Sequence, residues 1–239
     1  MDREFDKEKK FKIYLNNLLD HQIRTFIDDL MDHFVVYLFS GVIRNYFLNT
    51  YDRPNDLDLV LKMPNDVNFL EGILKNYGDY RRNTFGGYKI FIDNLPIDIW
   101  FIEDTWAIAN NHIAIRHNIE DSLLHSTFFN FSSIIYDLGN DEFIGDKLFH
   151  DFLESREMDI VLENNPNKIL CILKIKHYSE KYRISLSSTV INYYIRNFYS
   201  YTKEEYIKAQ KKHFGNVIYE YQQLLKFYNT LKFLVDYQY

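Results

Sequence analysis

The stretch that decides the fold reads Phe39-Ser40-Gly41-Val42-Ile43-Arg44-Asn45-Tyr46-Phe47-Leu48, then, after a short polar loop, Asn55-Asp56-Leu57-Asp58-Leu59-Val60. This pattern predicts a strand, a tight turn of small residues, a helix, a loop and a second strand. Side chains on a strand alternate between its two faces, so Asp56 and Asp58 project from one face and Leu57 and Leu59 from the other. Two adjacent carboxylates repel each other and lose hydration, and a divalent cation between them relieves both costs. The stretch therefore favours a metal site at Asp56 and Asp58.

A third acid, Asp98, lies on another expected strand. Residues 89–92 and 96–102 are predicted to form a hairpin around Asp93-Asn94. Asp98 is the acid within an otherwise apolar strand, and a buried carboxylate needs a partner or a metal. If this strand pairs with residues 56–62, three carboxylates converge. The alternative is an acid at a strand end that is bonded to a nearby Arg or a backbone N–H.

The remaining pattern predicts an α+β fold, with a mixed sheet flanked by helices and followed by a small all-α C-terminal domain. Apolar spacing predicts two helices over 3–33, a buried strand over 34–39, helices over 67–77, 123–138 and 145–153, and a short strand over 158–162. Residues 111–126 are interpreted as a surface segment. From residue 165 onward the pattern is wholly helical. We therefore expect N-terminal helices over 1–33, a sheet domain over 34–162 and a helical domain over 163–239.

Composition sets broad limits on the class of protein. The chain has 239 residues, 46% of them hydrophobic, which is enough for one large domain or a domain with a helical annex. A single cysteine, Cys171, excludes a disulfide framework and a cysteine metal site. No segment approaches the roughly 18 uninterrupted apolar residues of a membrane span. The N-terminal residues are charged and lack the apolar stretch of a signal peptide, so we expect a cytoplasmic protein without a membrane partner.

The net charge of −6 conceals an asymmetry between the two parts of the chain. Residues 1–162 hold 16 Lys or Arg and 28 Asp or Glu, whereas residues 163–239 hold 12 Lys or Arg and 6 Asp or Glu. A basic C-terminal part beside an acidic part suits a polyanionic substrate. The alternative is an ordinary solvated helical surface.

These blocks resemble the nucleotidyltransferases of the polymerase-β superfamily, and in more detail the head and neck of class II CCA-adding enzymes and bacterial poly(A) polymerases. The family's small-residue corner, helix and Asp-x-Asp strand are similar to residues 40–45 and 56–60. Its glycine, strand, turn and acid-bearing strand are similar to residues 86–99. Weaker similarities follow in the right order over residues 129–137, 141–145 and 166–170, so the resemblance covers roughly residues 35–190. It implies a palm-like nucleotidyltransferase sheet followed by a neck-like helical domain.

The resemblance also implies an activity: transfer of a nucleoside monophosphate from an NTP to a hydroxyl group, with two Mg²⁺ ions, or Mn²⁺, at the site. Asp56 and Asp58 would bridge both ions, and Asp98 would hold the ion that lowers the pKa of the attacking hydroxyl. The remaining implied residues bind the nucleotide: Ser40 and Gly41 cradle the β- and γ-phosphates, Arg44 orients the triphosphate or an acid, and Lys168 and Lys174 contact phosphate or base. For Arg44 a structural salt bridge is the alternative.

The chain departs from the family at the positions that help CCA-adding enzymes recognise CTP or ATP. The family's Arg-Asp pair is Thr127-Phe128 here and its Asn is Ser132, while neck arginines are Lys168, Cys171 and Lys174. The resemblance therefore implies ATP or CTP without choosing between them. It favours RNA, such as a tRNA 3′ end, as the acceptor. The alternatives are nucleotidylation of a protein or small molecule, as in toxin-like and antibiotic-modifying members, and a non-catalytic nucleotide-binding module.

Overall fold

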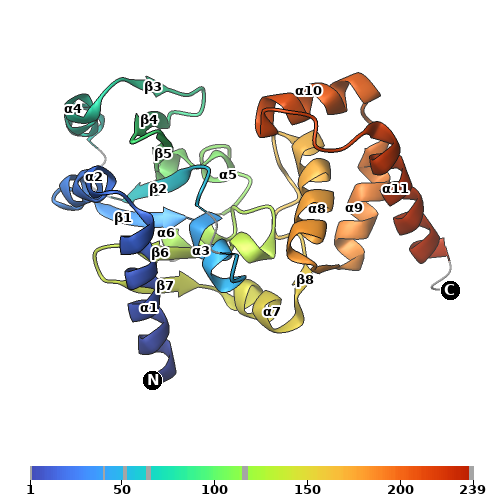
Figure 1. The fold of residues 1–239 in the computed structure, drawn as a ribbon, viewed down its shortest axis with the longest axis horizontal. Helices are drawn as coiled ribbons and strands as arrows, with labels where there is room; N and C mark the ends of the chain where they lie inside the picture. Colours follow the sequence, from blue (N-terminus) through green and yellow to red (C-terminus); the bar gives the residue numbers. More distant parts are fainter. Residues whose placement is uncertain (1, 40, 51–52, 63–65, 115–117, 237–239) are drawn as a thin grey trace. The chain divides into compact units, whose positions relative to one another are not determined.

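Two units divide the chain in the computed structural model, which describes residues 2–39, 41–50, 53–62, 66–114 and 118–236 (Figure 1). Unit 1 comprises Met1–Thr127 and Phe131–Leu153, and unit 2 comprises Phe128–Asn130 and Glu154–Tyr239. Unit 1 contains the main sheet and unit 2 is mostly helical. Each unit is described by itself below.

A seven-stranded mixed sheet forms the centre of unit 1. Its strands are β1 (Val35–Phe39), β2 (Leu57–Lys62), β3 (Tyr80–Arg82), β4 (Tyr88–Ile92), β5 (Leu95–Phe101), β6 (Ile134–Asp137) and β7 (Glu142–Gly145). Their order in the sheet is β3-β4-β5-β2-β1-β6-β7. β2 and β5 run parallel, whereas the other neighbouring pairs are antiparallel. The parallel pairing sets the two acidic strands side by side at the centre of the sheet.

Helices cover the sheet and bury its apolar side chains. They are α1 (Asp2–Leu18), α2 (His21–Met31), α3 (Gly41–Phe47), α4 (Val67–Tyr77), α5 (Trp106–Ala109), α6 (Ile119–Leu124) and α7 (Lys147–Ser155), with short 3₁₀ turns η1 (Ile102–Asp104) and η2 (Asn130–Ser132). The larger apolar cluster joins α1, α2 and α4 to the strand residues Leu57, Leu59, Ile97 and Ile99. A second cluster on the other face contains Tyr37, Val60, Ile102, Ile108, Leu123, Leu124 and Ile135. The sheet is therefore covered on both faces.

The described residues of unit 2 form four helices: α8 (Lys168–Tyr182), α9 (Ser188–Phe198), α10 (Lys203–Phe214) and α11 (Tyr221–Asp236). A short parallel pair, β8 (Glu157–Met158) and β9 (Ser185–Leu186), accompanies them. Thr202 and Glu205 form a capping box at the start of α10. The Thr202 side chain accepts a hydrogen bond from the backbone N–H of Glu205, and the Glu205 side chain accepts one from the backbone N–H of Thr202. Stacked rings around the buried Phe198 fill the core. Over the described residues, no helix of either unit is long and apolar enough to span a lipid bilayer.

The α+β class, the two N-terminal helices, the strand at 34–39, the helix at 67–77 and the hairpin are confirmed. The helix predicted over 123–138 is wrong, because this segment contains the end of α6, η2 and then β6. All four residues of β6 are buried, so the strand lacks the alternation that distinguishes a strand from a helix. The surface interpretation of 111–126 is also wrong for α6, where Glu120, Leu123 and Leu124 are buried.

Candidate functional site

Asp56 and Asp58 lie where the alternation of β2 predicts them. The strand begins at Leu57, so Asp56 directly precedes it and Asp58 is its second residue. Leu57 and Leu59 are fully buried in the larger apolar cluster. Asp56 is exposed and Asp58 is half-buried, which places the Asp58 side chain on the opposite face of the sheet from the two leucines.

Asp98 lies beside Asp58 on the neighbouring strand. The register of the parallel pair sets Asp58 opposite Asp98, between Leu57–Ile97 and Leu59–Ile99. Neighbouring strands lie about 4.8 Å apart, and residues in register project from the same face. Asp98 is half-buried while Ile97 and Ile99 are fully buried, as expected for that face. The two acidic strands therefore do pair, and they place two carboxylates side by side.

Lys89 extends this arrangement into a row of three charged residues. It lies opposite Asp98 in the antiparallel β4–β5 pair, and its Nζ atom is 2.7 Å from Oδ2 of Asp98. About a quarter of each of these two side chains is exposed. Because β5 lies between β4 and β2, the residues Lys89, Asp98 and Asp58 occupy successive strands at one level of the sheet. We call these three residues the charge row.

The partner of Asp98 was missed from the sequence, where an Arg or a backbone N–H was the alternative to a metal. A signal for Lys89 was nevertheless present. Asp93 and Asn94 both adopt positive φ, at 50° and 62°, in the two-residue hairpin turn. A two-residue turn determines the register of the strands that it joins, and counting outward from Asp93-Asn94 sets Lys89 opposite Asp98.

The acids differ in how well they fit a metal ion. Carboxylate oxygens are the ligands that Mg²⁺ prefers, and Asp56 and Asp58 offer them from two positions on one side of the chain. Asp98 already has a cationic partner in Lys89. Within the described ranges, no group of three or more His, Cys, Asp or Glu side chains is arranged to hold a metal ion. The donor chemistry thus fits a divalent cation at Asp56 and Asp58, and it does not fit one at Asp98 in this arrangement.

The expected phosphate-binding corner is described in part. Ser40 lies outside the described residues, and Gly41 begins α3. A Cβ atom added at Gly41 would meet no atom within 4 Å among the described residues beyond its chain neighbours and its own helix, so their packing does not require glycine there. Arg44 places its guanidinium carbon 5.8 Å from the centre of the Phe131 ring, and its Nη2 donates a 3.3 Å hydrogen bond to Asn45.

A buried carboxylate, Glu120, lies on the face of the sheet from which Asp58 projects. Its Oε1 accepts hydrogen bonds from Tyr37 at 2.6 Å and from Lys62 at 2.5 Å. Burial raises the pKa of Glu120, but the hydrogen bonds from Lys62 and Tyr37 outweigh it and hold the pKa below its ordinary value. Burial, with Glu120 as a hydrogen-bond partner, raises the pKa of Tyr37. This network joins α6 to β1 and β2, so it supports the strand that carries Asp58.

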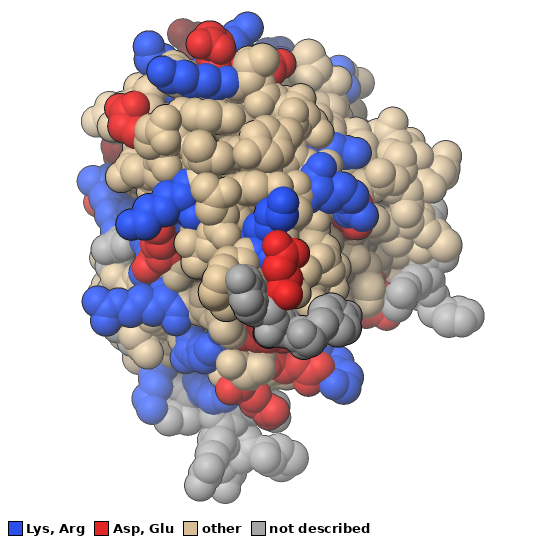
Figure 2. Space-filling model, turned by 90° about the vertical axis from the view of Figure 1, so that its right-hand side faces the viewer, with Lys and Arg blue, Asp and Glu red and all other residues tan. Residues whose placement is uncertain are grey.

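The two lysines expected to contact the nucleotide belong to unit 2, whereas the acids belong to unit 1. Lys168 begins α8 and is exposed, and Lys174 is half-buried on the same helix. On the face shown in Figure 2, Lys and Arg side chains are spread out and interspersed with Asp and Glu. At the departures from the family, Thr127 is buried and its Oγ1 lies 2.9 Å from the hydroxyl of Ser133. Phe128 packs against Tyr193, so neither position offers an exposed charged group.

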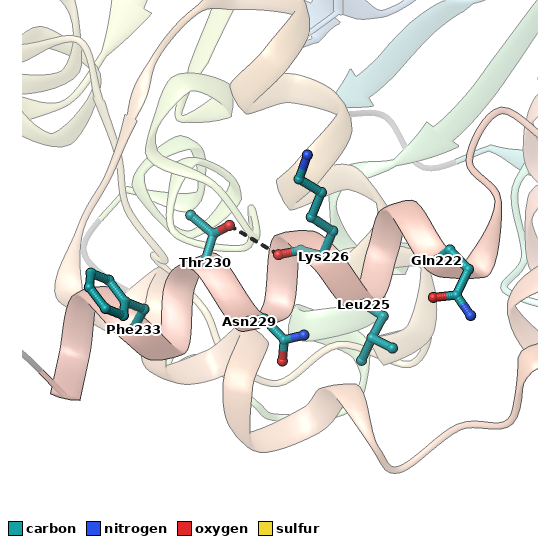
Figure 3. A pocket seen from close by; sticks show the side chains of 6 residues that line it. All are labelled: Gln222, Leu225, Lys226, Asn229, Thr230 and Phe233. Atoms are coloured by element: carbon teal, nitrogen blue, oxygen red, sulfur yellow. Dashed lines mark hydrogen bonds between the residues drawn. The ribbon is translucent and has the colours of Figure 1, made fainter.

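A shallow depression of about 440 Å³ lies on the surface of unit 2 (Figure 3). All its lining residues come from α11: Gln222, Leu225, Lys226, Asn229, Thr230 and Phe233. The Thr230 hydroxyl donates a hydrogen bond to the Lys226 carbonyl within the helix, as Figure 3 shows. A single helix face with one ionisable side chain has no converging groups for chemistry, so this depression is not the candidate site.

Comparison with known proteins identifies the fold. No protein-family model matches the chain, and no curated protein matches it. Solved structures do match: a CCA-adding enzyme with CTP has a TM-score of 0.65 at 14% identity, covering 92% of this chain and 54% of that one. The Thermotoga maritima CCA-adding enzyme with tRNA has a TM-score of 0.64 at 14% identity, covering 92% and 53%. A CCA-adding enzyme with ATP has a TM-score of 0.61 at 14% identity, covering 91% and 52%.

These matches show a shared fold. The chain has the mixed sheet and helical region found in the head and neck of class II CCA-adding enzymes. It spans about half the length of the solved chains that it matches.

Proposed function

We propose that the protein is a metal-dependent nucleotidyltransferase that transfers a nucleoside monophosphate from an NTP to a hydroxyl group. One observation carries the proposal: Asp58 and Asp98 lie in register on one face of a sheet whose fold is shared with CCA-adding enzymes. Asp56, two residues before Asp58, adds a carboxylate at the exposed end of the same strand. Two adjacent carboxylates are unfavourable in a purely structural core, because both lose hydration and each disfavours the ionised form of the other.

In the proposed reaction, the acceptor oxygen forms a bond to the α-phosphorus of the NTP as the bond to pyrophosphate breaks. Asp56 and Asp58 would hold Mg²⁺, or Mn²⁺, which would supply charge neutralisation and lower the pKa of the acceptor hydroxyl, whose proton leaves to water. Backbone N–H groups at Ser40 and Gly41 bind the terminal phosphates, and Arg44 orients the triphosphate. The contribution of the chain is mainly to position two reactants and to balance their charge.

For the nucleotide, we propose ATP or CTP, with Lys168 and Lys174 contacting its phosphates or base. The support is that CCA-adding enzymes of the same fold were solved with CTP and with ATP. Thr127 and Phe128 are buried and carry no charge, so these two positions cannot select a base by the charged hydrogen bonds that an Arg-Asp pair makes. Selection between the two nucleotides therefore depends on other residues of this chain.

For the acceptor, we propose the 3′ end of an RNA. The Thermotoga maritima enzyme of the same fold was solved with tRNA, and residues 163–239 of this chain carry an excess of Lys and Arg over Asp and Glu. Positive charge attracts a polyanion whatever its sequence. Protein and small-molecule acceptors are the competing outcomes of the test below.

The test incubates the protein with α-labelled ATP or CTP, Mg²⁺ and total RNA, and follows the label into RNA, protein and small molecules. Asp58→Asn should lower incorporation by roughly 10³-fold, which corresponds to about 4 kcal/mol in the activation free energy. Asp151→Asn is the matched control, because Asp151 is an exposed carboxylate on α7 that is paired with Lys147. It should leave incorporation unchanged.

Label in RNA that is lost in Asp58→Asn supports the proposal in full. Label in protein or in a small molecule supports the proposed nucleotidyl transfer and shows that the acceptor is not RNA. Absence of label from every fraction, or equal labelling by the parent and Asp58→Asn, overturns the proposed function.

A further inference from the structure

We infer that Lys89 takes the place of a cation at Asp98, so that the acidic site binds one divalent ion tightly, at Asp56 and Asp58, and not two. The inference rests on the proposed function and deepens it by assigning the charge balance of the same site. It also replaces the expectation that three carboxylates share two metal ions.

The first support is the direct ion pair. Lys89 Nζ lies 2.7 Å from Asp98 Oδ2, which is the short distance of a charge-assisted hydrogen bond. Both side chains are about three-quarters buried, so water screens the pair less than it screens a surface ion pair. A metal ion that binds Oδ2 of Asp98 must first displace this ammonium group.

The second support is the register, which holds Lys89 in place. Five consecutive pairs join β4 to β5, and Lys89–Asp98 is the second of them. The flanking residues Tyr88 and Ile90 are buried, so β4 cannot slip by one residue without turning two apolar side chains to the other face. Lys89 therefore approaches Asp98 from the side opposite β2.

The third support is the balance of charge. Lys89 places one positive charge directly beside Asp98. A second divalent ion at Asp98 would lie beside an ammonium group, and that like-charge contact weakens its binding.

The test is a Mn²⁺ titration without nucleotide, read from the electron paramagnetic resonance signal of free Mn²⁺. For the parent protein we expect one tight site per chain, which Asp58→Asn removes. Lys89→Met should gain a second site that binds Mn²⁺ at least about tenfold more tightly than any second site of the parent, because Asp98 is then a free ligand. Lys89→Gln is a second neutral variant, and both are checked for folding by circular dichroism and thermal unfolding.

Two controls separate charge from structure. Lys89→Arg keeps the positive charge and should bind Mn²⁺ as the parent does. Lys147→Met removes an ion-paired lysine from α7, where the Lys147–Asp151 distance is 2.5 Å and Lys147 is largely exposed, and it should not change Mn²⁺ binding.

Two equally tight sites in the parent, or no change in Lys89→Met and Lys89→Gln, overturn the inference and leave the proposed function standing. Absence of bound Mn²⁺ from every variant overturns both the inference and the metal-dependent function. The labelling experiment with Asp58→Asn tests the proposed function separately, because its outcome does not depend on Lys89.

Discussion

The hydroxyl of Tyr37 donates a 2.6 Å hydrogen bond to the carboxylate of Glu120, which lies 83 residues further along the chain. Lys62 donates to the same oxygen. Tyr37 lies on β1, Lys62 ends β2 and Glu120 lies in the first turn of α6. One buried carboxylate therefore ties α6 to β1 and to β2, and β2 is the strand that carries Asp58.

Glu120→Gln should lower the free energy of unfolding by about 1–3 kcal/mol at pH 7, because a buried network loses its charge-assisted hydrogen bonds. Urea unfolding followed by circular dichroism measures the change. Glu163→Gln is the control, since Glu163 forms an ion pair with Arg196 in which both side chains are more than half exposed. We expect a change of at most about 0.5 kcal/mol for that exposed pair.

The effect of Glu120→Gln should also depend on pH. The pKa of Glu120 in the folded protein lies below its ordinary value of 4.5. Its carboxylate therefore stabilises the fold above pH 4.5, and this contribution is lost as the pH falls through the lower pKa of the folded state. The difference between the parent and Glu120→Gln should shrink below pH 4.5. A difference that stays constant from pH 7 to pH 3 would contradict the assigned ion pair.

Gly41→Ala should separate nucleotide binding from folding. Among the described residues, an added Cβ meets no atom within 4 Å beyond its chain neighbours and its own helix backbone. Alanine also favours a helix over glycine by up to about 1 kcal/mol, so stability should stay equal or rise. If phosphates approach the backbone at Gly41, the methyl group obstructs them, and the KM for the NTP should rise about tenfold. Steady-state kinetics with the labelled NTP give the answer. An unchanged KM would remove Gly41 from the nucleotide site.

Gly87→Ala should destabilise unit 1. A Cβ at Gly87 would lie 3.0 Å from the side-chain amide nitrogen of Asn83, 3.0 Å from the carbonyl oxygen of Ile99 and 3.2 Å from Cβ of Trp100, so the β5 backbone would have to shift slightly. Overpacking of this kind costs about 1–3 kcal/mol. The displacement would also disturb the Lys89–Asp98 pair. Thermal unfolding and Mn²⁺ binding measure the two effects.

Gly72→Ala provides the matched control for Gly87→Ala. Gly72 lies inside α4, and an added Cβ there meets no atom within 4 Å. The substitution should stabilise the protein by about 0.5–1 kcal/mol, because alanine has the higher helix propensity. Equal effects of the two substitutions would show that the close approach at Gly87 has no energetic consequence.

Cys171 should report on the unfolding of unit 2. The residue is 4% exposed, and burial raises the pKa of its thiol to about 12. A thiol-specific reagent at pH 8 should label the folded protein at least about 100-fold more slowly than the urea-unfolded protein, because reaction needs an accessible thiolate. Rapid labelling without denaturant would contradict the burial of Cys171 in α8.

The same thiol predicts the sign of a pH effect. Between its ordinary pKa of 9.0 and the folded value of about 12, the unfolded state releases the proton first. Stability should therefore fall as the pH rises through this range. Cys171→Ala should lose this part of the pH dependence, which urea unfolding at pH 8 and pH 10 can test.

Local features of the sequence determined much of the site. The alternation of β2 placed Asp58 on the other face of the strand from Leu57 and Leu59, and this depends only on the geometry of one strand. The turn at Asp93-Asn94 determined the hairpin, and with it the partner of Asp98. The charge row could thus have been predicted in part, because a two-residue turn links strand register to sequence position.

Only the tertiary structure decided that β2 and β5 run parallel, that β6 is a strand and that Glu120 is buried. These outcomes depend on contacts between segments that lie far apart in the chain. A fully buried strand such as β6 has no alternation to reveal it, and Glu120 is recognisable as an internal residue only once Tyr37 and Lys62 are placed beside it. The sequence determined which side chains share a face, whereas the packing of distant segments decided which faces meet.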